Sequence, residues 1–325
     1  MTQPDPRAFA VVGLGRIGGG LAAHALEQGY RVIGVDRHPA DPALLAAGLT
    51  QARNLADLRD ALPRPRLTFL YVPAGAAVDA ILDELAPILD SNDVIVDGGN
   101  SYWGDSLARH ERLRARSLHF VDMGTSGGPS GARHGACFMV GGTADAFATL
   151  RPILQDLAVE GGVVHCGAPG AGHFTKLVHN GIEFGMVQAL GEGLELLERA
   201  PLPLPIADVL RLWTRGSVIR SWLVELLADA YATHGDLASI PRHVEDTGEV
   251  NWLVEDALRL EVPIPVITQS VIQLLASRDR DRSASAAVAA IRHGFGGHPF
   301  GEDPAIATIR RTSRVSRDPH GNGKP

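Results

Sequence analysis

Four polar side chains between residues 172 and 184 lie at the spacing of one helix face. The segment GHFTKLVHNGIEF contains Lys176, His179, Asn180 and Glu183, which share one face if the segment is helical. A lysine beside a carboxylate can carry acid–base chemistry if the lysine pKa falls from about 10.4 toward roughly 7–8. An exposed salt-bridge stripe would need neither the asparagine nor the glycines around it. We therefore interpret this face as a site of proton transfer.

Glycines surround these four residues. Gly172, Gly181 and Gly185 lie in the same segment, and each weakens a helix by up to about 1 kcal/mol. Glycine also leaves room for a close neighbour where a Cβ would collide. We expect another backbone or a ligand to come close at these positions.

A glycine-rich turn, GLGRIG, lies near the amino terminus at residues 13–18. It follows an apolar run at 8–12 and opens a helix expected at 17–28, which is the context of a dinucleotide-binding fingerprint. The first glycine permits the tight turn, the second lets backbone approach a pyrophosphate, and the third lets helix and strand pack closely. The helix amino terminus supplies N–H groups for the phosphate. These reasons assign the following residues to the cofactor: Gly13, Gly15, Arg16, Ile17 and Gly18.

The next predicted strand ends at Asp36, about 20 residues after the turn. Its carboxylate can accept hydrogen bonds from the ribose hydroxyls of NAD and would repel the 2′-phosphate of NADP. The neighbouring Arg37 can stack on adenine or hold a 2′-phosphate. The sequence therefore favours NAD and leaves NADP as the alternative.

These residues need a scaffold in which strands and helices alternate. Apolar runs predict strands at 8–12, 31–35, 67–72, 94–97, 118–122 and 136–140. Helical patterns lie between them at 17–28, 74–89, 105–114 and 144–157, and only helices are expected beyond residue 173. Such alternation implies a mostly parallel sheet with helices on both faces. We predict an α/β fold with an amino-terminal doubly wound Rossmann domain (1–170) that binds NAD. An all-helical domain (171–325) for substrate and dimerisation follows it.

Composition bounds the partners. The 325 residues carry a formal charge of −7, which argues against nucleic acid or an anionic membrane as the main partner. Two cysteines cannot make a disulfide scaffold, and we expect both to be small buried residues. No apolar run approaches the length of a membrane span, and the amino terminus lacks the features of a secretory signal. A cytoplasmic location is expected.

Five motifs, in consistent order from about residue 9 to 300, resemble those of the 6-phosphogluconate dehydrogenases, in particular the short, mostly bacterial branch. They are YVPAG (71–75), VDGGNSYWGDS (96–106), FVDMGTSGGPSGARHGACFMVGG (120–142), KLVHNGIEFGMVQALGEG (176–193) and RHGFGGH (292–298). More generally, the lysine helix resembles that of the β-hydroxyacid dehydrogenases.

The resemblance implies the oxidative decarboxylation of 6-phosphogluconate to ribulose 5-phosphate, CO2 and NADH, a step of the pentose phosphate pathway. It implies Lys176 as base and later proton donor, Glu183 as acid, and no metal, because the new keto group accepts the electrons. It further implies at least a homodimer, with Arg292 and His298 reaching the phosphate from the neighbouring subunit. The remaining positions that it assigns are Val72, Pro73 and Ala74 for the cofactor, and Asn100, Ser126, Gly127, Gly128, His179 and Asn180 for the sugar acid.

The sequence departs from this family where the substrate phosphate is expected. Phe184 replaces a tyrosine, Leu274 replaces an arginine, and Val250 with Asn251 replaces a glycine and an arginine. Arg278, one helical turn after Leu274, is a candidate substitute. These changes leave open a related dehydrogenase acting on a non-phosphorylated sugar acid. A non-catalytic NAD-binding sensor is a more remote alternative, because a sensor needs no acid–base pair.

Overall fold

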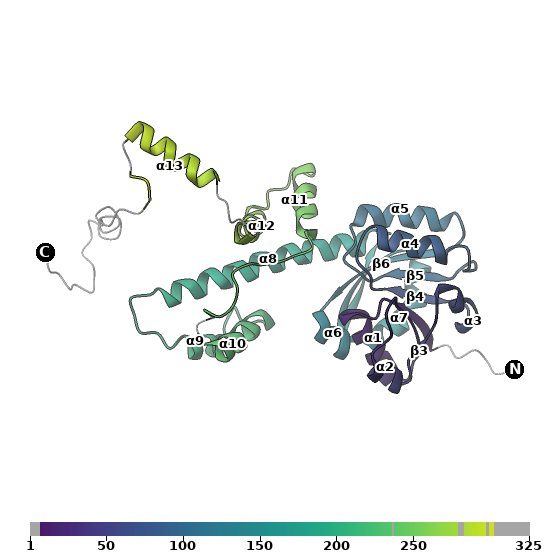
Figure 1. Cartoon of the computed structure of the whole chain (residues 1–325). Helices are drawn as coiled ribbons and strands as arrows, with labels where there is room; N and C mark the ends of the chain where they lie inside the picture. The colour runs from purple at the N-terminus through teal and green to yellow at the C-terminus, as the bar shows by residue number, and fades with distance from the viewer. Residues whose placement is uncertain (1–6, 236, 279–282, 297–298, 302–325) are drawn as a thin grey trace. The chain divides into compact units, whose positions relative to one another are not determined.

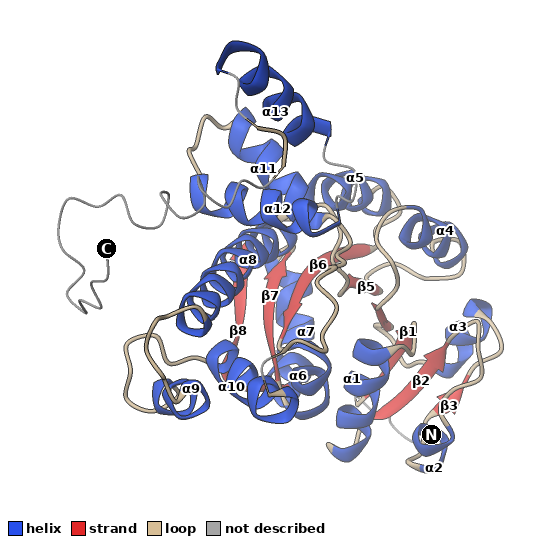
Figure 2. Cartoon of the chain, turned by 60° about the vertical axis from the view of Figure 1, so that its left-hand side comes forward, coloured by secondary structure: helices blue, strands red, loops and turns tan. Residues whose placement is uncertain are grey.

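A single sheet forms the amino-terminal half of the molecule. The computed structural model describes residues 7–235, 237–278, 283–296 and 299–301. In this part of the chain eight strands form one sheet in the order β3-β2-β1-β4-β5-β6-β7-β8, and every neighbouring pair is parallel except β6 and β7 (Figures 1 and 2). The strands are β1 (Ala8–Val12), β2 (Arg31–Val35), β3 (Thr50–Gln51), β4 (Leu67–Leu70), β5 (Val94–Asp97), β6 (His119–Ser126), β7 (Ala136–Gly141) and β8 (Ala158–Gly167).

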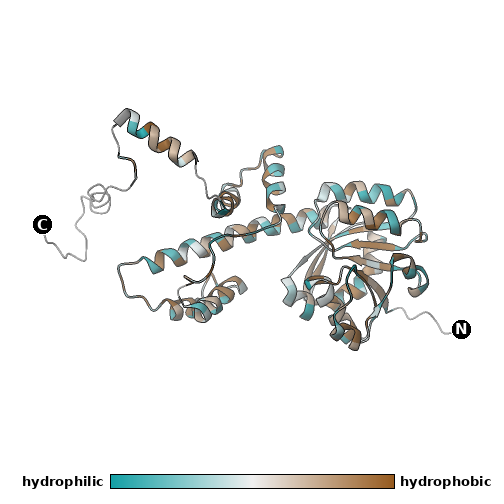
Figure 3. Cartoon of the chain, viewed as in Figure 1, coloured by the Kyte–Doolittle hydropathy of each residue, from teal (hydrophilic) through white to brown (hydrophobic). Residues whose placement is uncertain are grey.

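The sheet is buried on both faces. Alternate residues of a strand point to opposite sides, so one strand contributes to two apolar cores. Phe9 and Val11 of β1 join one apolar core, whereas Ala10 and Val12 join a second. Helices α1 and α7 contribute to the first core and α4 and α5 to the second, and most of the strands are hydrophobic (Figure 3). The helices here are α1 (Arg16–Glu27), α2 (Pro42–Ala46), α3 (Leu58–Ala61), α4 (Ala76–Leu85), α5 (Trp103–Arg114), α6 (Gly128–His134) and α7 (Ala144–Leu157), with a 3-10 turn at Leu55–Asp57.

A helix of 28 residues, α8 (Ala171–Glu198), follows the sheet. Two small apolar clusters pack along it: one includes Leu177 and residues of α11 and α12, and the other includes Leu194 and residues of α9 and α10. The remaining helices are α9 (Ile206–Trp213), α10 (Trp222–His234), α11 (Glu249–Arg259), α12 (Pro265–Arg278) and α13 (Ser283–Gly296). No helix in the described ranges is long and apolar enough to cross a membrane.

The chain divides into two compact units. The larger comprises residues 1–241 and 245–273, and the smaller contains residues 242–244 and the chain from 274 onward. Within the smaller unit, Arg278 Nε donates to the Val244 carbonyl at 2.6 Å, and His293 stacks on Phe300.

The predicted fold class, a Rossmann-type parallel sheet followed by helices, is confirmed. Several boundaries were wrong. The predicted helix at 74–89 is shortened at both ends to α4: it starts at Ala76 because Gly75, with a φ of +83°, caps it, and it ends at Leu85. The strand expected at 118–122 continues to Ser126 because its second half pairs with β7. Five elements were not predicted: β3, β8, α2, α3 and α6. Every residue of β8 is at least partly exposed, and the strand lacks the continuous apolar run of the inner strands.

Candidate active site

The first turn of α8 is held by a buried carboxylate. Asp122 on β6 is fully buried, and its two oxygens accept the backbone N–H groups of Gly170 at 2.7 Å and His173 at 2.8 Å. The first N–H groups of a helix have no partner inside it, so Asp122 satisfies two donors at this end. It thereby fixes where α8 begins relative to the sheet.

Glycines allow α8 to lie directly on the strands. A Cβ on Gly172 would lie 2.3 Å from the Asp122 carbonyl oxygen and 2.6 Å from the Met139 oxygen. A Cβ on Gly124 of β6 would lie 2.3 Å from the Cβ of Lys176. The expected backbone approach at Gly172 is therefore present. At Gly181 the close neighbour is instead the side chain of Leu253.

A buried histidine adds a lateral contact to the same turn. His173 Nδ1 lies 2.7 Å from the Ser106 hydroxyl of α5, and its Nε2 lies 3.1 Å from the carbonyl oxygen of Asp97 at the end of β5. The Asp97 carboxylate accepts from the Ser101 hydroxyl at 2.7 Å and from the Gly99 N–H at 3.2 Å. This network joins α8 to the loop that carries Asn100.

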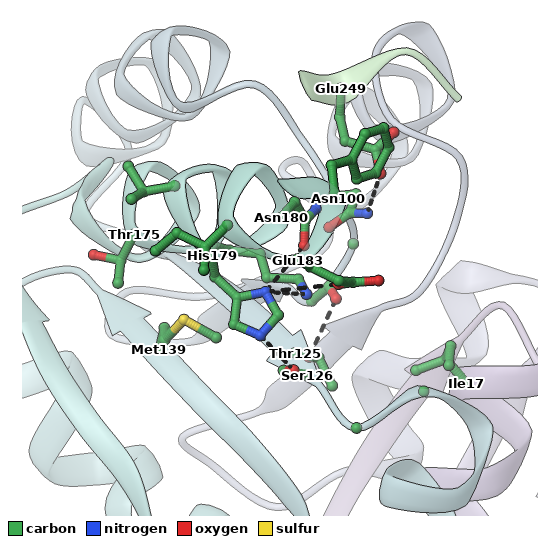
Figure 4. Close-up of a pocket in the computed structure, with 18 of the residues that line it drawn as sticks. Ile17, Asn100, Thr125, Ser126, Met139, Thr175, His179, Asn180, Glu183 and Glu249 are labelled. Atoms are coloured by element: carbon green, nitrogen blue, oxygen red, sulfur yellow. Dashed lines mark hydrogen bonds and ion pairs between the residues drawn. The ribbon is translucent and has the colours of Figure 1, made fainter. Parts of the chain in front are cut away.

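The four polar residues of α8 lie together, as their spacing predicts. His179 Nδ1 lies 3.4 Å from Lys176 Nζ, 3.2 Å from Asn180 Oδ1 and 4.0 Å from Glu183 Oε2. On its other side, His179 Nε2 lies 3.0 Å from the Ser126 hydroxyl of β6. In Figure 4, the ring of His179 points from α8 toward Ser126.

Lys176 has the environment that a general base requires. Its side chain is only 8% exposed, and this burial lowers the pKa of Lys176 because the charged ammonium loses solvation. Glu183 and Glu249 oppose the shift, since their negative charges favour the ammonium form. The lysine therefore gives up its proton at a lower pH than an exposed lysine does.

The α8 face opens into a pocket of about 1170 Å³. The pocket is lined by the glycine turn and the amino terminus of α1, and by residues of α8, α10 and α11. Predicted residues that line it are Gly15, Arg16, Ile17, Gly18, Val72, Asn100, Ser126, Gly127, Gly128, Lys176, His179, Asn180 and Glu183. Phe184, one of the departures noted above, lines it too.

The glycine turn has the geometry that the fingerprint needs. Gly13 has a φ of +92°, and a Cβ on Gly18 would lie 2.0 Å from the Gly13 carbonyl oxygen, so the turn and the helix are in direct contact. No atom lies within 4 Å of the Cβ position of Gly15, which leaves the backbone open to the pocket. The sheet order also changes direction between β1 and β4, the switch point at which open α/β sheets bind ligands.

Asp36 supports this turn from the end of β2. Its Oδ2 accepts the Leu14 N–H at 2.7 Å, and its Oδ1 accepts the His38 N–H at 2.9 Å. Partial burial acts to raise the pKa of Asp36, but these backbone donors outweigh it and the pKa is lowered. The carboxylate is thus held ionised beside the turn.

Not every predicted residue lies at the pocket wall. Gly13, Asp36, Arg37, Pro73 and Ala74 are outside its lining, and their cofactor roles stay predictions. Arg278 and Arg292 belong to the smaller unit, and His298 lies outside the described residues. Their phosphate roles stay predictions as well.

The structure also adds residues that the sequence did not indicate. Glu249 of α11 and an apolar group on α10, Trp222, Leu223 and Leu226, line the pocket. The available signal for Glu249 was its place in a Thr-Gly-Glu segment directly before a predicted helix. Cys137 is exposed, so the expectation that it is buried was wrong.

Comparison with known proteins gives matches over both halves of the chain. Residues 8–167 match the NAD binding domain of 6-phosphogluconate dehydrogenase, and residues 172–311 match the 6-phosphogluconate dehydrogenase C-terminal domain. The YqeC protein of Bacillus subtilis is 40% identical over 89% of this chain and 98% of its own length.

Two further relatives extend the comparison. The NAD(+)-dependent, decarboxylating 6-phosphogluconate dehydrogenase of Haloferax volcanii is 43% identical over 89% of this chain and 97% of its own. The solved structure of Plasmodium falciparum 6-phosphogluconate dehydrogenase superposes with a TM-score of 0.76 at 23% identity, covering 91% of this chain and 66% of that one. The solved structure supports the fold alone.

Proposed function

Because the chain belongs to the 6-phosphogluconate dehydrogenase family, we propose that it catalyses the NAD-dependent oxidative decarboxylation of 6-phosphogluconate. The products are ribulose 5-phosphate, CO2 and NADH. The observation that carries the proposal is the single pocket that joins the amino terminus of α1 to Lys176, Asn180 and Glu183.

The residues present fit NAD. The open Gly15 backbone and the first N–H groups of α1, which have no acceptor within the helix, suit a pyrophosphate. The ionised Asp36 beside the turn suits a ribose diol. NAD, when bound, accepts the hydride from the substrate carbon. The relative from Haloferax volcanii is NAD(+)-dependent, which supports NAD as the cofactor.

The proton transfers fall to α8. Lys176, with its lowered pKa, takes the proton of the substrate hydroxyl as the carbon is oxidised. The resulting β-keto acid loses CO2, and Lys176 returns its proton to the enolate oxygen. Glu183, near His179 at the pocket wall, then supplies a proton to the carbon that lost CO2, while Lys176 takes back the proton of the enol hydroxyl, so that the ketone forms.

The other polar residues bind the substrate. Ser126 and the backbone of Gly127 and Gly128 hold the carboxylate, and Asn100, His179 and Asn180 orient the hydroxyls. Support for these roles comes from their shared place in the pocket lining. These assignments use side chains from the loop after β5, from β6 and from α8 around one substrate.

The two domains have separate roles, and the active enzyme is an assembly of subunits. Residues 1–170 hold the cofactor and residues 171–325 supply substrate and dimer contacts, a division supported by family matches that meet between residues 167 and 172. The active assembly is at least a homodimer, in which Arg292 and His298 of one subunit serve the phosphate in the other. The resemblance of the RHGFGGH segment supports this arrangement.

One observation favours a second candidate substrate, a non-phosphorylated sugar acid. Phe184 presents an apolar ring at the pocket, and it also packs on the cluster formed by α8, α11 and α12. Among the described residues that line the pocket, Arg16 and Lys176 are the arginines and lysines, and both already have other roles. A phosphate would therefore depend on cations from outside this lining.

Initial rates of NADH formation test the function. The enzyme is offered 6-phosphogluconate or gluconate, each with NAD and with NADP. Strong preference for 6-phosphogluconate with NAD supports the proposal, whereas equal or better rates with gluconate favour the second candidate. NAD binding without turnover of any sugar acid would overturn both and favour a sensor.

A further inference from the structure

Glu249 is a pocket carboxylate that the proposed proton transfers do not use. It is the first residue of α11 and follows Gly248, whose φ of +81° is in the left-handed region. The next residue, Val250, is fully buried in the cluster between α11 and α8. On α8, Gly181 makes room for Leu253, because a Cβ there would lie 2.3 Å from Leu253 Cδ2. These contacts fix the start of α11, and with it Glu249, against the catalytic helix.

The carboxylate of Glu249 is tied to Asn100 across the pocket wall. Glu249 Oε1 accepts from Asn100 Nδ2 at 3.3 Å, and Oε2 accepts from the Thr247 hydroxyl. Figure 4 shows the Asn100–Glu249 pair beside Asn180. An ionised carboxylate has about four acceptor positions, and an amide nitrogen has two N–H groups. Both partners therefore keep hydrogen-bonding capacity for a ligand.

The main pocket is the space beside this pair that can hold a sugar acid. A second hollow lined by Asn100, Lys176, Asn180 and Glu249 has a volume of about 10 Å³, room for one water molecule at most. The same four residues also line the large pocket. The pair is thus a wall of the substrate site.

Charge decides which ligand group suits this wall. Glu249 interacts electrostatically with Lys176, so it is a source of negative potential inside the pocket. A phosphate or carboxylate beside it would be repelled. A hydroxyl can donate to the carboxylate of Glu249 and accept from the amide of Asn100 at the same time.

We propose that Glu249, together with Asn100, binds one hydroxyl of the polyol chain of the substrate. The pair makes the enzyme selective for a substrate that carries a hydroxyl, and not a charged group, at that position. The inference rests on the proposed function, because it requires a sugar acid in the pocket. It assigns to α11 a part in substrate selection.

Steady-state kinetics of Glu249→Gln test the inference. The glutamine keeps the size of the side chain but removes the charge, so kcat/KM for the sugar acid should fall about tenfold to a hundredfold, as when a hydrogen bond to a charged group is lost. Most of the loss should appear in KM for the acid, and KM for NAD should stay within twofold. Glu255→Gln is the matched control, because Glu255 is an exposed residue of the same helix outside the pocket lining.

Deoxy substrates identify the hydroxyl. Analogues of the preferred acid that lack the C2, C4 or C5 hydroxyl are compared in wild type and Glu249→Gln. With one of these analogues, kcat/KM of the wild type should fall by the factor that Glu249→Gln has already lost. The two enzymes should then have equal kcat/KM for that analogue. If each of the three analogues lowers kcat/KM by the same factor in wild type and in Glu249→Gln, the inference is overturned.

The outcomes separate this inference from the proposed function. If the wild type makes NADH from a sugar acid and Glu249→Gln, with unchanged Tm, stays within twofold in kcat/KM, the role of Glu249 is refuted and the function stands. If the wild type makes no NADH from any sugar acid, the function is refuted and the inference falls with it.

Discussion

One added methyl group can test whether the seat of α8 sets the reaction rate. In Gly124→Ala the new Cβ would lie 2.3 Å from Lys176 Cβ and 2.9 Å from Lys176 Cγ. Carbon atoms in contact prefer about 3.5–4.0 Å, so lysine and sheet must separate by about 1.2 Å or more. A misplacement of about 1 Å can cost about a hundredfold in rate. We expect kcat to fall by about that factor.

The assay is NADH formation at saturating sugar acid, with NAD affinity measured in parallel. The nearest neighbours of a Cβ on Gly124 belong to Lys176 and Gly172 and not to the glycine turn, so KM for NAD should stay within about twofold. Gly191→Ala is the control on the same helix: no atom lies within 4 Å of its Cβ position. That variant should keep full activity and gain up to about 1 kcal/mol of stability, because alanine favours the helix.

Unfolding must be separated from displacement. Overpacking by a methyl group costs about 1–3 kcal/mol, so thermal unfolding of Gly124→Ala should still give a cooperative transition above the assay temperature. A folded Gly124→Ala enzyme with kcat within threefold of wild type would refute the reasoning. The position of Lys176 on the sheet would then not limit the chemistry.

Four further outcomes follow from the site. Lys176→Met should abolish NADH formation and leave NAD binding, measured by calorimetry, unchanged; near-normal NADH production would remove the lysine from its role. Glu183→Gln should slow kcat strongly with little effect on NAD affinity, and an unimpaired rate would exclude it as the acid. In wild type, kcat/KM should rise with pH and level off below the ordinary lysine value of 10.5, because burial lowers the pKa of Lys176 and the base acts unprotonated; a rise centred at or above 10.5 would contradict this. Asp122→Ala should lose about 3 kcal/mol or more in urea unfolding, since two hydrogen bonds to a charged group disappear, whereas exposed Asp83→Ala should lose at most about 1 kcal/mol.

Local patterns predicted the elements whose signals lie in their own residues. The helix expected at 144–157 is α7, which Thr143 caps by accepting the Ala146 N–H. The stripe at Lys176 was predicted because helical spacing alone brings its members together. The turn at Gly13 was predicted from its residue types, because the positive φ of Gly13 is a conformation that favours glycine.

Features that depend on distant partners were missed. Strand β8 forms by pairing with β7, with two register shifts. Its residues are partly or fully exposed, so its own sequence gives no indication of this pairing. Glu249 reaches the pocket because α11 packs on α8 through Val250, a contact separated by many residues along the chain. Cys137, which lies opposite Ser126 in the pairing of β6 with β7, is exposed although the other residues of β7 are buried.

Because Asp122 fixes the first turn of α8, a tilt of the helix displaces its residues in proportion to their distance from that turn. With a rise of 1.5 Å per residue, Lys176 lies about 8 Å from the clamped start of the helix and Leu194 about 35 Å from it. If the helix swings as a rigid rod about its first turn, a displacement at Leu194 reaches Lys176 reduced to about a fifth. On that geometry, a displacement of the α9–α10 cluster acts on the base at about a fifth of its size, whereas a methyl group at Gly124 acts on Lys176 directly.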